Sequence, residues 1–202
     1  MNTPRMVAIV LIVFASAAFA DDEISKTASV SAQEGGIPVS KLIAIVAKKT
    51  GKKFVLDPRV RADVVIIGQD TASVSYGDLL TILRVHGFAA VDDGGYVQVI
   101  PEANVRVMPV PRVSDKDTKL ANEFVDAVVT VKHVSAAQLV PILRPLMPQY
   151  GHLAAYPCTN QLILSDTYSN VRRLEGMIRE FDVGESTFKP YNCEPKDNAS
   201  SR

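Results

Sequence analysis

The chain has few of the residue types that build catalytic and metal sites. It contains no tryptophan, two cysteines and three histidines among 202 residues. The histidines His86, His133 and His152 fall in different predicted elements, so they lack the paired spacing of a metal site. No serine has the context of a nucleophile elbow, and no calcium-loop pattern surrounds the aspartates. We therefore expect no metal, no cofactor and no enzymatic activity.

An excess of charge of either sign is also absent. The 22 basic residues balance 22 acidic ones, so no global field favours nucleic acid or anionic lipid. The basic cluster Lys48, Lys49, Lys52 and Lys53 flanks the end of a predicted helix, where cations oppose the helix dipole. We interpret it as a solvated helix end, with an acidic protein partner as the alternative.

No apolar run reaches the ~20 residues that a membrane helix needs. A shorter run, residues 6–14, follows Arg5 and leads into small residues that end at Ala20. This pattern predicts a signal peptide over residues 1–20, cleaved after Ala20. We expect the mature chain to be exported and not inserted in a membrane.

Composition divides the rest of the chain into two blocks. Residues 102–123 are rich in proline and in alternating charge without a regular period, so they are predicted to form a linker. Residues 184–202 are a polar, aperiodic tail. The blocks at 25–101 and 124–183 are each small enough that only roughly 60% of the unfolded surface can be buried.

The first block predicts the order βαββαββ. A short alternating strand is expected over residues 25–33, and "KFVLDP", "ADVVIIG", "FAAV" and "YVQVI" supply the other strands. "ADVVIIG" is nearly all apolar, so we expect it to be a buried strand. Ser75 with Asp78 predicts a capping box at the start of the second helix. The inward positions of the two helices are expected to be Val39, Leu42, Ile43 and Val46, and then Leu79, Leu80 and Leu83.

The second block predicts the order βαββα. "FVDAVVTVKHV" is a strand, and Ser135 with Gln138 suggests a second capping box. Pro141 either kinks the helix that follows or moves its start, because an internal proline costs ~3 kcal/mol. "GHLAAYPCTNQLILSD" is a hairpin, after which Asp166 or Thr167 caps the last helix. The apolar positions of the two helices are Leu139, Val140, Leu143 and Leu146, and then Val171, Leu174, Met177, Ile178 and Phe181.

These residues resemble a known family. "LLTILRVHGFAAV…YVQVIP" and "VSAAQLVPILRPLMPQYGHLAAYPCTNQLILSD…NVRRLEGMIREFD" are similar to the first and second periplasmic domains of type II secretion secretins. The resemblance implies an α+β fold of two small domains. In the first, two helices pack between a two-stranded and a three-stranded sheet. In the second, a KH-like βαββα unit has both helices on one face.

The resemblance also implies function and partners. Secretins continue into a pore-forming region that this sequence does not include, so we do not expect a channel. We expect instead a periplasmic module that binds a secretin or an inner-membrane secretion component, as a monomer or weak oligomer. Small sheets expose strand edges to which a partner strand can add, and Ser29, Val30 and Ser31 are the candidate edge.

One alternative function remains open. The first domain also resembles the N-terminal domain of TonB-dependent receptors, which would imply a signalling module. Nucleic-acid binding is not expected, because the KH signature Gly-x-x-Gly is absent from the sequence.

The two cysteines are candidates for a disulfide bond. The family usually has a second proline where Cys158 stands in the hairpin turn, and Cys193 lies in the tail. In an oxidising periplasm two cysteines pair more often than not, so a bridge between Cys158 and Cys193 is expected to tie the tail to the hairpin tip. An unpaired or intermolecular thiol is the alternative.

Overall fold

The computed structural model describes residues 36–185 together with Lys189 and Cys193. The predicted signal peptide, the strand predicted over residues 25–33 and most of the tail lie outside the described residues. Ser29, Val30 and Ser31 are among them. Below, the first lobe is residues 36–101 and the second lobe is residues 112–185.

The first lobe shows the order βαββαββ, but its first strand is Ile37–Pro38 and not the predicted segment 25–33. It contains β1 (Ile37–Pro38), α1 (Val39–Thr50), β2 (Phe54–Leu56), β3 (Asp63–Val64), η1 (Thr71–Ser73), α2 (Tyr76–Val85), β4 (Phe88–Asp92) and β5 (Val97–Pro101). β1 and β3 form a two-stranded antiparallel sheet. The three-stranded sheet has the order β2-β5-β4, with β2 parallel and β4 antiparallel to β5.

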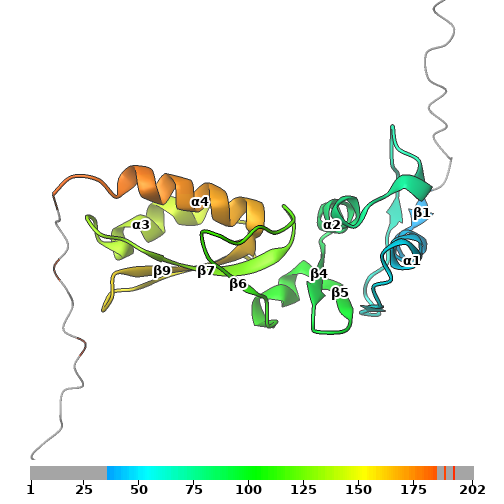
Figure 1. Cartoon of the computed structure of the whole chain (residues 1–202), viewed down its shortest axis with the longest axis horizontal. Coiled ribbons are helices and arrows are strands. Elements are labelled where there is room, and N and C mark those ends of the chain that lie inside the picture. The colour runs from blue at the N-terminus through cyan, green and yellow to red at the C-terminus, as the bar shows by residue number, and fades with distance from the viewer. Residues whose placement is uncertain (1–35, 186–188, 190–192, 194–202) are drawn as a thin grey trace, which may run out of the picture. The chain divides into compact units, whose positions relative to one another are not determined.

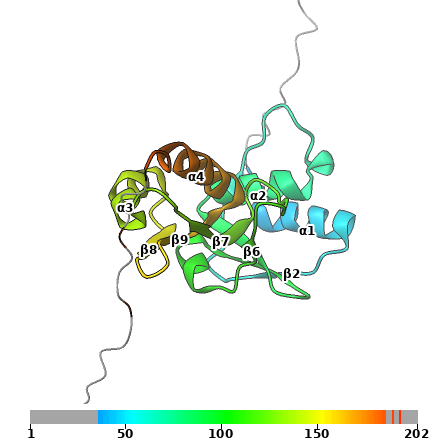
Figure 2. The ribbon, with the colours of Figure 1, turned by 60° about the vertical axis from the view of Figure 1, so that its left-hand side comes forward.

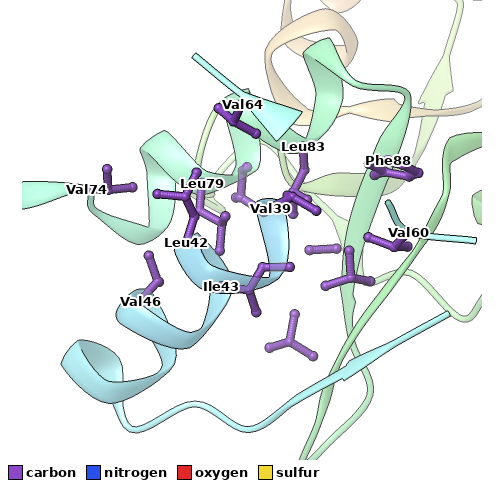
Figure 3. Close-up of a cluster of buried hydrophobic side chains, with 14 residues drawn as sticks. Val39, Leu42, Ile43, Val46, Val60, Val64, Val74, Leu79, Leu83 and Phe88 are labelled. Carbon is purple, nitrogen blue, oxygen red and sulfur yellow. The ribbon is translucent and has the colours of Figure 1, made fainter. Parts of the chain in front are cut away.

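The two helices of the first lobe bury the predicted faces. Figure 3 shows Leu42 and Ile43 of α1 close to Leu79 and Leu83 of α2, in a cluster that also receives Val64 from β3. The predicted capping box is confirmed. The Ser75 hydroxyl accepts from the N–H of Asp78 at 3.1 Å, and the Asp78 carboxylate accepts from the N–H of Ser75 at 2.9 Å.

Regular structure is present in the segment that we expected to be a linker. Residues 102–123 contain the 3₁₀ helix η2 (Glu102–Val107) and the strand β6 (Arg112–Val113). Val105 and Val113 are buried, and Val113 packs in the core of the second lobe. A two-residue strand beside prolines is too short to give a periodic pattern, so the sequence analysis missed it.

The second lobe is a four-stranded sheet with two helices. It contains β7 (Phe124–Thr130), α3 (Ala136–Leu143), η3 (Arg144–Leu146), β8 (His152–Tyr156), β9 (Gln161–Thr167) and α4 (Tyr168–Phe181). The strand order is β6-β7-β9-β8, with β6 parallel to β7 and the other pairs antiparallel. α3 and α4 lie on the same face of this sheet (Figures 1 and 2). The predicted βαββα unit is therefore present, with β6 added at one edge.

Two details of the second lobe differ from prediction. Ser135 precedes α3 but makes no side-chain capping bond, so the Ser135–Gln138 capping box is wrong. Phe181 is half-exposed, because the buried stripe of α4 ends at Ile178. Pro141 is accommodated inside α3, which ends two residues later and passes into η3.

Candidate protein-interaction surfaces

The β1–β3 sheet is the smallest sheet of the described residues. Ile37 pairs with Val64, and Pro38 pairs with Asp63. Each strand has one neighbour, so both outer edges of this sheet lack a strand within the described part of the chain. A strand edge of this kind can accept a strand from another polypeptide.

The residues that follow β3 contradict the expectation of a buried strand. Only Asp63 and Val64 of "ADVVIIG" are in a strand, and only Val64 among the seven is fully buried. Val65 and Ile67 are 62% and 73% exposed. The segment alternates between an inward and an outward face, but its outward face is apolar as well. Sequence pattern cannot distinguish this arrangement from a strand buried on both faces.

An open groove lies beside the same sheet. It has a volume of about 300 Å³ and is lined by residues 38–40 and 60–63. We call this sheet, the groove, Val65 and Ile67 the β1–β3 surface. It combines unpaired backbone with exposed apolar side chains, which are the two features that a strand-adding partner would use.

Three of the four lysines of the basic cluster have partners within the first lobe. Lys49 donates to the carbonyls of Ala72 and Val74, at 3.2 and 3.0 Å. Lys52 forms an ion pair with Asp92 at 3.0 Å. The ammonium of Lys53 lies 5.6 Å from the ring centroid of Tyr96. The cluster is therefore a set of local contacts around the end of α1 and not a continuous basic patch.

Two residues of the turn between β8 and β9, Cys158 and Asn160, bond to other parts of the chain. Cys158 and Cys193 form a disulfide in the structure, with their Cα atoms 5.7 Å apart. Asn160 is 2% exposed and has a positive φ of 52°. Its side-chain oxygen accepts from the N–H of Ala136, and its amide nitrogen donates to the carbonyls of Val131 and Val134.

Asn160 thus supplies the cap that Ser135 does not. The acceptor for the first turn of α3 comes from a residue that is 24 positions away along the chain. No local pattern predicts such a contact, although an asparagine in a hairpin turn is a signal for the left-handed conformation.

Asp182 binds the loop between β7 and α3 from its other side. Its carboxylate accepts from the N–H groups of Lys132, His133 and Val134, and the shortest of these bonds is 2.6 Å. Burial raises the pKa of Asp182, but the three N–H donors outweigh burial and hold the pKa below its usual value. The loop between β7 and α3 is therefore held on both sides by side chains from later elements.

The described residues hold no group of three or more His, Cys, Asp or Glu side chains that could bind a metal ion. Within the same part of the chain, no helix has the length and apolar character needed to cross a bilayer.

Comparisons with known protein families match both lobes. The model of the GspD-like N0 domain matches residues 36–99. The model of the bacterial type II/III secretion system short domain matches residues 127–187. Together these matches cover most of the two lobes.

Full-length relatives are much longer than this chain. It is 34% identical to secretin XcpQ of Pseudomonas aeruginosa over 146 residues, which are 71% of this chain and 21% of XcpQ. It is 31% identical to secretin GspD of Vibrio cholerae over 157 residues, which are 75% of this chain and 23% of GspD. The chain thus spans about a fifth to a quarter of the length of these relatives.

A solved structure is similar to the fold. It is the outer membrane complex of the Klebsiella pneumoniae type II secretion system, which contains PulD, PulS and the PulC HR domain. The match has a TM-score of 0.64 at 25% identity, and it covers 77% of this chain and 26% of the matched chain.

Proposed function

Because the chain carries the N0 domain and the short domain of the type II secretion secretin family, we propose that it docks onto components of a type II secretion system. In this proposal it is a periplasmic interaction module without catalytic activity. The partner is a secretin or an inner-membrane secretion component. The module acts as a monomer or a weak oligomer.

The β1–β3 surface is the single observation that carries the proposal. Val65 and Ile67 keep their apolar side chains in solvent beside two unpaired strand edges of the described residues. Burying one such side chain in an interface is favourable by ~1.5–3 kcal/mol. A partner that covers both would gain enough to explain why the chain retains apolar residues there.

The Klebsiella complex supports the choice of partner. In that complex PulD is found with PulS and with the HR domain of PulC, both of which are other secretion proteins. We therefore expect the partner of this chain among homologues of PulD, PulS and PulC.

The test is capture from the native periplasm after crosslinking, with identification of the captured proteins. The wild-type chain is expected to capture a secretin or an inner-membrane secretion protein. Replacing Val65 and Ile67 by glutamate should reduce capture by about tenfold or more, because each side chain would place a charge in the interface. Val107→Glu is the matched control, since Val107 is 80% exposed outside this surface.

Circular dichroism should show the same folded content in all variants, because the altered side chains are exposed. Capture of neither class of secretion protein by the wild type would contradict the proposal. Capture of a membrane-bound regulator instead would favour the signalling module of the TonB-receptor type.

A further inference from the structure

The strand β7 of the second lobe is longer than its neighbour β6. Each of the seven residues of β7 has a partner in β9, but only Asp126 and Ala127 have a partner in β6. Val128, Val129 and Thr130 therefore have a strand on one side only, within the described part of the chain.

The backbone of this segment is directed toward the open side. The N–H of Asp126 donates to the carbonyl of Pro111 at 3.0 Å, so the hydrogen-bonding groups of Asp126 face β6. Backbone direction alternates along a strand, which means that Val128 and Thr130 face the same edge. Beyond the end of β6, Thr130 offers a donor and an acceptor to any strand placed there.

A turn explains why β6 stops early. The carboxylate of Asp117 accepts from the N–H of Ser114 at 2.7 Å and from its hydroxyl at 2.8 Å. Arg172 of α4 donates to the carbonyls of Ser114 and Asp117, at 2.5 and 2.9 Å. The chain after Val113 is thus fixed to α4 and does not continue alongside β7.

The open edge lies in a groove of about 840 Å³. Residues 128–130 of β7 line it, together with residues 112–115, with Glu175 and Arg179 of α4, and with Asp182 directly after α4. Glu175 and Arg179 are four residues apart, so they lie on one face of α4. The volume is in the range of ~300–1,000 Å³ that is typical of ligand sites.

The charges that remain available in the groove are positive. Glu175 pairs with Arg172 at 2.6 Å, and Asp182 accepts the N–H donors described above. Asp115 also lines the groove; its side chain is 89% exposed and pairs with Arg172 at 3.7 Å. Asp117 is held by Ser114. By contrast, Arg112 and Arg179 are exposed and have no ion pair among the described residues. The acidic groups are thus engaged within the lobe, and the two arginines are not.

We propose that the groove binds an extended, acidic segment of a protein partner, which adds to β7 as a strand in the line of β6. Main-chain bonds to the carbonyl of Val128 and to the N–H and carbonyl of Thr130 would hold the segment, and acidic side chains would reach Arg112 and Arg179. This inference deepens the proposed function and rests on it, because it names the chemistry of a partner segment.

The probe is a short fluorescent peptide that alternates valine with glutamate, and binding is followed by anisotropy. Two control peptides accompany it: one has lysine in place of glutamate, and the other has N-methyl groups on alternate amides. The wild-type chain is expected to bind the glutamate peptide, to bind the lysine peptide at least about tenfold more weakly, and to reject the N-methylated one. Binding should weaken with rising salt, because exposed charges are screened.

The variant Arg112→Glu with Arg179→Glu tests the groove itself. It should weaken binding by about tenfold or more, since two attractions become repulsions. Arg106→Glu is the matched control, because Arg106 is an exposed arginine outside the groove and should leave binding unchanged. Amide chemical shifts of Val128 and Thr130 should move on titration with the peptide, which locates the binding independently of the variants.

Three results would overturn the inference: equal binding of the glutamate and lysine peptides, binding of the N-methylated peptide, or no effect of the double charge reversal. Self-association of the chain through this edge, with no competition by the peptide, would also overturn it. If the peptide fails while the wild type still captures a secretion protein, only this inference is lost. Failure of that capture would instead remove the proposed function.

Discussion

Replacing Asn160 should destabilise the second lobe more than any other single change in the hairpin turn. Its side chain satisfies three buried or partly buried backbone groups, with distances of 2.7 Å to Ala136 N, 2.7 Å to Val131 O and 2.8 Å to Val134 O. Its backbone also has a positive φ of 52°. Asn160→Ala removes the three bonds and leaves at this positive φ a residue that tolerates the left-handed region less well than asparagine does.

The magnitude follows from these two losses. A buried group left without its partner costs ~1–3 kcal/mol, and water can compensate some of the three groups, so we expect a loss of ~3 kcal/mol. A left-handed alanine adds ~1 kcal/mol. Asn160→Gly should therefore lower the free energy of unfolding by ~3 kcal/mol, and Asn160→Ala by ~4 kcal/mol.

Urea denaturation of the oxidised protein, followed by circular dichroism, measures these differences. Thr159→Ala is the control, since Thr159 is exposed and its side chain bonds only to Gln161 among the residues that the structure describes. It should change stability by less than ~0.5 kcal/mol. The reasoning is refuted if Asn160→Ala falls within that range, or if the glycine variant is as destabilised as the alanine variant.

Two further predictions concern the same lobe. Thiol titration of unfolded, unreduced protein should find no free sulfhydryl, and replacing Cys158 and Cys193 by serine should lower stability by up to ~3–4 kcal/mol in the chain-entropy model. Two free thiols per chain would show that the bridge does not form. The pKa of Asp182 is lowered in the folded state. Its contribution to the free energy of unfolding is therefore complete above the pKa of about 4 that an aspartate has in the unfolded chain, and it is lost as the pH falls further. Asp182→Asn should therefore cost ~1–3 kcal/mol at pH 7 and flatten the loss of stability below about pH 4, as measured by urea midpoints across that range. An unchanged acid profile would contradict this role.

The elements with strong local signals were predictable from the sequence. The spacing of leucines and valines predicted the buried faces of α1 and α2, and Ser75 with Asp78 predicted the start of α2. These features depend on neighbours within a turn or two of the same helix. Periodicity and capping chemistry are local, so they can be read from a single chain.

The predictions that were wrong concern features that depend on residues far away along the chain. "ADVVIIG" has the composition of a buried strand, but nothing among the described residues covers Val65 and Ile67. Ser135 has the spacing of a capping box, yet the N–H of Ala136 is bonded to Asn160. In both places the outcome is decided by which segment packs nearby, and that information is not contained in local sequence.

The open edge of β7 could not be predicted for the same reason. It arises because a two-residue strand in an expected linker pairs with only part of β7. The strand length of a neighbour, and not the sequence of β7, determines how much of the edge stays free.

Site-specific photocrosslinking in the periplasm tests the central claim most directly. A photoreactive amino acid at Ile67 is compared with one at Lys48, which is exposed at the end of α1. The account predicts that the probe at Ile67 joins the chain to a secretin or an inner-membrane secretion protein, and that the probe at Lys48 does so much less. Equal crosslinking at both positions, or no secretion protein at either, would contradict it.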